Sequence, residues 1–190
     1  MAELRRRQIL DAASDCVRKA GFHGARMAEI AQAAGLSVGQ IYRCFESKEA
    51  IIGAIIAEDV AETRRKIMEL QNSGAPFVEA AVERAPEILD EAFDPDRAAL
   101  LLEVAAEAAR NPTAAALLQA ADAEVRGVIL SVLRQGADGR SERELAARGE
   151  VLGMLFDGMA MRAVAHPHAD REALCEVFRS VLRRLLSEPL

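Results

Sequence analysis

The sequence predicts an all-α protein of about nine helices. Apolar residues recur three and four positions apart in every long segment, which is the spacing of one helical face. Only two threonines and one tyrosine occur in 190 residues, and this scarcity of β-branched polar and aromatic side chains disfavours a sheet. Short breaks rich in Gly, Pro, Ser, Asp and Asn separate the periodic segments, as between the helices of a bundle.

The first three helices are predicted to be short and to be set off by glycines. Gly21 and Gly35 each end a helix, because a left-handed residue after the last turn carries no Cβ penalty when it is glycine. Ser37, with Gln40 three residues later, forms a capping box that starts the third helix. The predicted bounds are 4–20, 27–34 and 38–45. The expected buried stripe of the third helix consists of Val38, Ile41 and Phe45.

Longer helices are predicted for the remainder of the chain. Ser47, Ser141 and Asp170 stand at expected N-caps, and Asp94-Pro95 and Asn111-Pro112 each place proline at the first helical position after a capping residue. Pro86 lies within a periodic segment and predicts a kink or a split there, since proline removes a backbone hydrogen bond. The predicted bounds are 48–70, 77–90, 95–110, 112–135, 141–164 and 170–186.

Charge divides the chain near residue 48. Residues 1–48 carry a net +3 and the remainder carries −9, within a total of −6. This asymmetry indicates a basic binding arm over 1–48 on an acidic body over 49–190. Arg5, Arg6 and Arg7 crowd the start of the first helix, where they are either solvated or in contact with phosphate.

No signature of catalysis or of a bound cofactor is present. The three cysteines form no CxxC pair, and the histidines lack the spacing of metal ligands. Hydrolase, metalloprotease and phosphate-loop motifs are absent, so we expect neither an enzyme nor a cofactor or metal site. The sequence shows no signal peptide and no apolar run of the roughly 18–20 residues that a membrane span needs. We therefore expect no membrane association and a cytoplasmic location.

The outward face of the third helix suits a DNA major groove. Its side chains are those of Gln40, Tyr42, Arg43 and Cys44, beside Gly39. An amide matches adenine and a guanidinium matches guanine, whereas the phenol is expected to position a phosphate. The alternative interpretation is a solvated surface. Cys44 is expected to be a half-buried thiol, with a redox sensor as the alternative.

The N-terminal segment resembles the TetR family of bacterial transcriptional regulators. The resemblance covers about the first 50 residues and rests on many positions at fixed spacing. They are Ile9-Leu10-Asp11-Ala12-Ala13, Gly21-Phe22, Ile30-Ala31, Ala33-Ala34-Gly35-Leu36-Ser37, Gly39, Ile41-Tyr42, Phe45 and Ser47-Lys48-Glu49. The C-terminal part matches this family only in the number and rhythm of its helices.

The resemblance implies a DNA-binding domain over 1–48 and a ligand-binding and dimerisation domain over 49–190. It also implies a homodimer that places the third helix of each subunit in the major groove of a palindromic operator. The DNA-binding residues expected on this basis are Arg26, Met27, Ser37, Val38, Gly39, Gln40, Tyr42, Arg43, Cys44 and Lys48. Two of them depart from the family pattern. Arg26 stands where Thr or Ser would cap the second helix, which costs about 1 kcal/mol, and Cys44 stands where an aromatic residue or His is usual.

The resemblance also implies a repressor that a small, apolar effector releases from DNA. The expected effector-lining residues are Met68, Phe77, Phe93, Leu102, Glu103, Met154, Asp157 and Met161, with ordinary core packing as the alternative for the Met and Phe side chains. Dimerisation is expected through the helices over 141–164 and 170–186. The competing functional hypothesis is an all-α small-molecule-binding protein or enzyme without a DNA-binding role.

Overall fold

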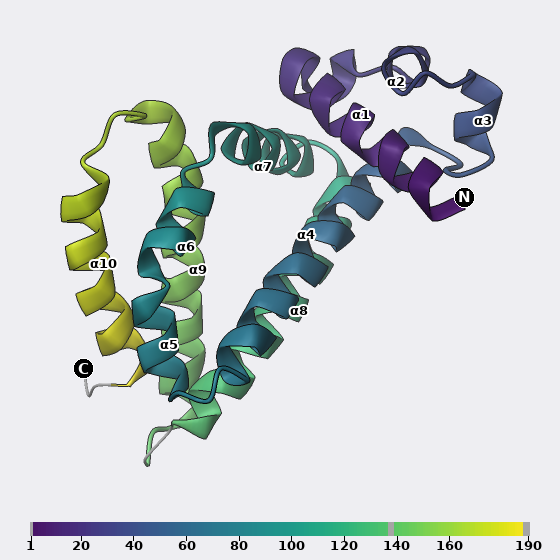
Figure 1. Ribbon diagram of the computed structural model, residues 1–190. Coiled ribbons are helices and arrows are strands. Elements are labelled where there is room, and N and C mark those ends of the chain that lie inside the picture. The colour runs from purple at the N-terminus through teal and green to yellow at the C-terminus, as the bar shows by residue number, and fades with distance from the viewer. Residues whose placement is uncertain (1, 137–138, 188–190) are drawn as a thin grey trace. The chain divides into compact units, whose positions relative to one another are not determined.

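The computed structural model describes residues 2–136 and 139–187, and all regular secondary structure within them is α-helical. This confirms the predicted class (Figure 1). The helices are α1 (Ala2–Gly24), α2 (Met27–Ala33), α3 (Val38–Tyr42), α4 (Lys48–Gln71), α5 (Phe77–Glu83), α6 (Ala85–Ala92), α7 (Pro95–Ala108), α8 (Pro112–Gln135), α9 (Glu142–Ala165) and α10 (Arg171–Leu186). None of the described helices combines the length and the low charge that crossing a bilayer requires.

The segment predicted as one helix over 77–90 is two helices. The helical conformation breaks at Arg84, so that α5 ends at Glu83 and α6 begins at Ala85. Pro86 is tolerated in the first turn of α6, where its missing N–H would have no partner within the helix. The expected split therefore occurs two residues before the proline.

The predicted caps form hydrogen bonds at the helix starts. Asp94 Oδ1 accepts from the backbone N–H three residues later at 2.7 Å, and Asp170 Oδ1 does the same at 3.0 Å. Ser141 Oγ accepts from the Glu144 N–H at 3.2 Å. The Oε1 atom of Glu144 accepts a hydrogen bond from Arg148 Nη2 at 2.8 Å. The sequence pattern at Ser141 thus provides the cap of α9 and also a partner for a buried arginine.

Gly21 interrupts α1, as predicted. Its φ of 72° and ψ of 169° lie in a region that residues with a Cβ almost never adopt. A Cβ added there would also lie 3.2 Å from Glu103 Oε2. Phe22, directly after the break, is buried in the core beside the N-terminal helices. The glycine therefore determines the backbone path at this point of α1.

Gly21→Ala is expected to lower the free energy of unfolding by about 1–3 kcal/mol, the cost of holding a non-glycine residue in this conformation. Chemical denaturation of the purified protein measures the change. Gly127→Ala is the matched control, because Gly127 lies within α8 with open space around its Cβ position. That control is expected to be neutral or stabilising by up to about 1 kcal/mol. Equal effects of the two substitutions would contradict the conformational argument.

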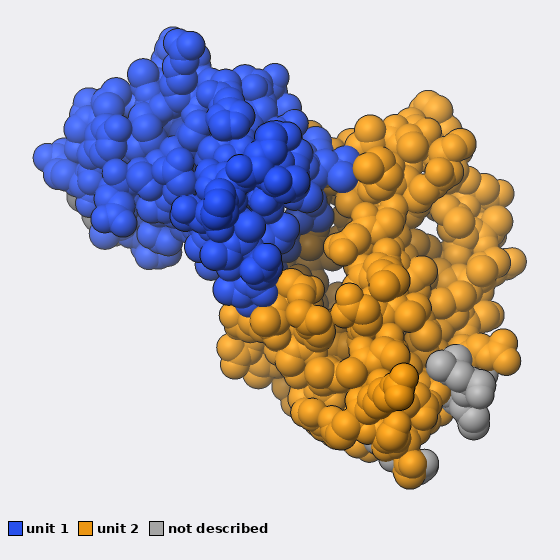
Figure 2. Space-filling model, turned by 180° about the vertical axis from the view of Figure 1, so that it is seen from behind, with its two compact units in different colours: residues 1–60, 99–121 blue, residues 61–98, 122–190 orange. Residues whose placement is uncertain are grey.

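The chain forms two compact units (Figure 2). Unit 1 comprises residues 1–60 and 99–121, and unit 2 comprises residues 61–98 and 122–190. The units divide the chain differently from the predicted domains, because parts of α4, α7 and α8 pack with the N-terminal helices. The core of unit 1 accordingly joins Ile9, Ile30 and Ile41 to Ile51 and Val104. The functional boundary at residue 48 remains a prediction.

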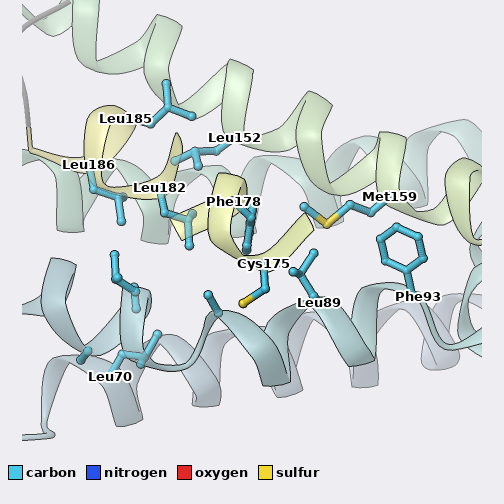
Figure 3. Close-up of a cluster of buried hydrophobic side chains, with 14 of the residues drawn as sticks. Leu70, Leu89, Phe93, Leu152, Met159, Cys175, Phe178, Leu182, Leu185 and Leu186 are labelled. Carbon is cyan, nitrogen blue, oxygen red and sulfur yellow. The ribbon is translucent and has the colours of Figure 1, made fainter. Parts of the chain in front are cut away.

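The core of unit 2 forms where α10 packs against α5 and α6. Leu89, Phe93, Met159 and Phe178 are among its buried side chains (Figure 3). Arg148 of α9 is also buried here, with 1% of its surface exposed. Its guanidinium donates to the carbonyl oxygens of Arg184 at 3.0 Å and Leu185 at 2.9 Å. An arginine of one helix thus binds the last carbonyls of another, which have no partner within α10.

Candidate nucleic-acid interface

A helix–turn–helix is formed by α2 and α3 in unit 1 (Figure 1). Gly35 has a φ of 65° at the turn, and the Leu36 N–H donates to the Ala31 carbonyl oxygen at 2.9 Å. This bond is the six-residue closure typical of a helix that ends in a left-handed glycine. The predicted end of α2 is confirmed. The turn over residues 34–37 brings α3 back beside α2, with Ile41 fully buried as its anchor.

The capping box at the start of α3 is complete. Ser37 Oγ accepts from the Gln40 N–H at 3.3 Å, and Gln40 Oε1 accepts from the Ser37 N–H at 2.8 Å. This confirms the sequence pattern and adds a constraint on Gln40. Its amide oxygen is already engaged, so its Nε2 remains as the group available to a base edge.

The outward side of α3 is free of packing. Tyr42 is 53% exposed, Arg43 is exposed, and nothing lies within 4 Å of a Cβ added at Gly39. Val38 was expected in the buried stripe, and this expectation is wrong, because 38% of its surface is exposed. Val38 is the first residue of α3, where the chain has only begun to turn toward the core. The buried side consists of Ile41 and, just beyond the helix, Phe45.

The start of α2 has no side-chain cap from its N-cap residue, and a glutamate inside the helix binds the N-cap backbone. Arg26 occupies the N-cap without a side-chain hydrogen bond to the helix, so the expected loss of a Thr or Ser cap occurs. Glu29 compensates in part, because its Oε2 accepts from the Arg26 N–H at 3.0 Å. The guanidinium of Arg26 is exposed, whereas Met27 is half-buried against the core of unit 1. Of these two predicted contact residues, Arg26 is the accessible one.

Lys48 is positioned by an aromatic ring and a carbonyl group. Its Nζ donates to the Phe22 carbonyl oxygen at 2.6 Å and lies 4.3 Å from the centroid of the Phe22 ring. An ammonium group has three N–H donors, so two remain for a phosphate. Cys44 is half-buried and packs against the core of unit 1. This agrees with the expectation that Cys44 is a half-buried thiol.

The expected effector-lining residues are divided between the two units. Leu102 and Glu103 belong to unit 1, and the other six belong to unit 2. Phe93 is part of the unit 2 core, and Phe77 packs against it. Met68, Met154 and Met161 are exposed. These placements leave the effector site a prediction.

Asp157 is an acidic member of the expected effector-lining set, and its surroundings disfavour its charged form. Partial burial raises the pKa of its carboxyl group, and the nearby carboxylates of Asp122 and Glu150 raise it further. Within the described parts of the chain, no three His, Cys, Asp or Glu side chains gather in a way that would hold a metal ion.

Several contacts in unit 1 have no signal in the sequence pattern. The Arg6 guanidinium lies 4.6 Å from the centroid of the Phe45 ring. Glu107 of α7 is 1% exposed, and its Oε2 lies 3.2 Å from His23 Nε2 at the end of α1. Asn111 Nδ2 donates to Glu107 Oε1 at 2.9 Å. The Arg6–Phe45 and His23–Glu107 contacts join residues far apart in the chain, so periodicity and capping patterns could not reveal them, whereas Asn111 and Glu107 are four residues apart.

Two sequence-family profiles match the chain. One, described as bacterial regulatory proteins of the tetR family, matches residues 9–55. The other, described as the C-terminal part of BetI-type transcriptional repressors, matches residues 78–187. Together they cover both the helix–turn–helix and most of the remaining helices.

Individual relatives agree with these profiles. The chain is 38% identical to the HTH-type transcriptional regulator UidR of Escherichia coli over 111 residues, which is 58% of this chain and 55% of UidR. It is 27% identical to the HTH-type nicotine-responsive transcriptional repressor HdnoR of Paenarthrobacter nicotinovorans, over 90% of each chain. The solved structure of Salmonella enterica GusR is similar over 96% of this chain and 95% of GusR, with a TM-score of 0.77 and 28% identity.

Proposed function

The chain belongs to the TetR family of bacterial regulatory proteins, and from this membership we propose that it is a dimeric, ligand-responsive transcriptional repressor. Each subunit places α3 in the major groove of one half of a palindromic operator. The residues that contact DNA are those predicted above, with Gln40 and Arg43 at the base edges and Tyr42, Arg26 and Lys48 at the phosphates. An effector bound in the C-terminal part releases the dimer.

The unpacked face of α3 is the observation that carries this proposal. Tyr42 and Arg43 are exposed next to an unobstructed Gly39, so this side of α3 is accessible to a partner. A small residue in the first turn permits close approach to base edges, and the guanidinium supplies paired donors that match guanine. An enzyme or storage protein of the same fold has no need for this face.

A binding measurement tests the proposal. Fluorescence anisotropy compares a labelled duplex from the DNA upstream of the gene with a scrambled duplex of equal length, at a stated salt concentration. Specific recognition by this class of protein is expected to exceed non-specific binding by about 10³-fold or more. Equal affinity for the two duplexes, repeated with fragments covering the surrounding genes, would overturn the proposal.

The dimer interface is proposed on α9 and α10, the helices predicted from the sequence. Val151, Met154 and Met161 are exposed along one side of α9, with Gly158 between the two methionines. Leu174 and Val177 are exposed on α10. These residues recur at helical spacing and would leave an apolar surface in water, which is typical of an interaction site. A second copy of the chain covers it, as in a two-fold bundle.

Met154→Asp is expected to weaken dimerisation at least about 30-fold, because a two-fold interface would bury two unpaired carboxylates at about 1–3 kcal/mol each. Sedimentation velocity over a concentration series measures the dissociation constant. Met68→Asp is the matched control, since Met68 is an exposed methionine of α4 outside this surface. A Met154→Asp protein that remains as dimeric as the control would rule out the interface.

The effector is proposed to be a small, largely apolar molecule. HdnoR, which aligns over 90% of its length with this chain, is described as nicotine-responsive. Met68 provides an adaptable side chain in unit 2, and Asp157 provides a carboxyl group that would orient a cationic ligand.

The effector proposal is tested through thermodynamic linkage. An effector must weaken DNA binding by the same factor by which DNA weakens effector binding. Titrating the protein–operator complex with a panel of apolar acids and amines measures both factors. Tight binding of a panel member without any change in operator affinity would contradict its role as effector.

A further inference from the structure

The first helix carries an arginine that the structure places beside the end of α3. Arg6 is half-buried, and its guanidinium lies 4.6 Å from the centroid of the Phe45 ring. Its two neighbours differ. Arg5 is exposed, and Arg7 forms an ion pair with Asp11 at 3.4 Å, with both of these side chains 68% exposed. Of the three arginines, Arg6 alone is held against the α3–α4 connection.

An open hollow of about 600 Å³ lies at this point of unit 1. Arg6, Tyr42 and Arg43 line it with polar groups, and buried Phe45 and Ala54 contribute apolar surface. Neither Arg6 nor Arg43 forms an ion pair within the residues that the structure describes. Glu46 is the acidic residue in the lining. The two guanidiniums therefore leave the hollow with a net positive charge.

We propose that Arg6 binds a phosphate of the operator backbone, so that the hollow receives a phosphodiester group next to the base-reading end of α3. The inference rests on the proposed DNA-binding function and adds a contact from α1 to it. An arginine whose guanidinium lies over an aromatic ring still has N–H groups that can bind phosphate oxygens. Because Phe45 already restricts the side chain, less conformational entropy is lost on binding.

This contact also accounts for the charge at the start of α1. Three consecutive arginines oppose the dipole at a helix N-terminus, which is a local cost without an anionic partner. A phosphate beside Arg6 supplies that partner. Contacts to phosphate set the position of a protein on DNA and carry no base preference, so the role of Arg6 is distinct from that proposed for Arg43.

The salt dependence of DNA binding tests this assignment. Each phosphate contact contributes about 0.9 to the slope of log K against log salt. Arg6→Gln is therefore expected to reduce the slope by about 1.8 for a dimer, with the ratio of operator to scrambled affinity unchanged. Arg7→Gln is the matched control and is expected to leave the slope unchanged, because Asp11 already neutralises Arg7. Arg6→Lys keeps the charge and is expected to restore most of the slope.

The possible outcomes separate this inference from the proposed function. Circular dichroism and thermal melting establish that each variant is folded. Equal slopes for Arg6→Gln and Arg7→Gln, with selective operator binding intact, would overturn the Arg6 contact alone. If the wild-type protein binds the operator and the scrambled duplex equally, the proposed function is overturned. The salt slopes measured on the scrambled duplex then still test the Arg6 contact. Absence of any DNA binding would overturn both.

Discussion

Arg43→Ala is expected to lower the selectivity for the operator about 30-fold or more while leaving the fold intact. Arg43 directly follows α3. Its side chain is exposed and forms no ion pair within the described residues. One paired contact to guanine contributes about 1–3 kcal/mol of discrimination, so loss in both subunits removes about 2–6 kcal/mol. The side chain supports no core residue, and the melting temperature is therefore expected to remain unchanged.

Anisotropy titrations with the operator and the scrambled duplex measure this loss as a ratio of affinities. Arg43→Lys is the informative second variant, because a lysine keeps the charge but not the paired donor geometry. It is expected to retain non-specific affinity and to lose base preference. Gln40→Ala is a less clean test, since it also removes half of the capping box with Ser37. An unchanged affinity ratio in Arg43→Ala would exclude this residue from base recognition.

Arg148→Met is expected to lower the free energy of unfolding by about 2–4 kcal/mol. The substitution keeps an unbranched apolar stem but removes every donor from a site that is 1% exposed. The carbonyl groups of Arg184 and Leu185 would lose their bonds to Arg148. The partner carboxylate of Glu144 is 36% exposed and can regain water, which keeps the loss below that of a fully buried ion pair.

Urea denaturation followed by circular dichroism measures the effect, and Arg126→Met provides the comparison. Arg126 also pairs with carboxylates, Asp122 at 2.6 Å and Glu150 at 3.3 Å, but 43% of its side chain is exposed. Exposed ion pairs contribute about 0–1 kcal/mol. The Arg148 variant is therefore expected to be the less stable by a wide margin. Similar losses in the two variants would show that the bonds to α10 contribute little.

Local chemistry explains why the helices could be predicted from the sequence. Asp94, Asn111 and Asp170 each cap the helix that follows, and Gly21 and Gly35 each end a helix at a positive φ. These interactions link residues no more than a few positions apart, so the sequence displays them directly. The helix–turn–helix was predictable for the same reason, because the Gly35 turn and the Ser37 cap are both local.

The contacts that hold the candidate DNA-binding side chains in place could not be predicted from local sequence patterns. Lys48 is held by Phe22, and Arg6 is held by Phe45. Both pairs are distant in the chain, and nothing in the spacing of charged residues indicates which arginine of three is held in place. The error at Val38 has a related origin. Helical spacing places it on the buried stripe, but as the first residue of α3 it precedes the point where the core closes over the helix.

The sequence by itself determined the all-α class, the helix ends and the candidate reading face, since caps, left-handed glycines and apolar spacing act within a few residues. Only the tertiary structure decided that parts of α4, α7 and α8 share a core with the N-terminal helices, and that Arg148 caps α10 from α9. Those arrangements depend on which apolar faces meet. Many pairings of amphipathic helices bury similar apolar area, so side-chain packing across long sequence separations selects among them.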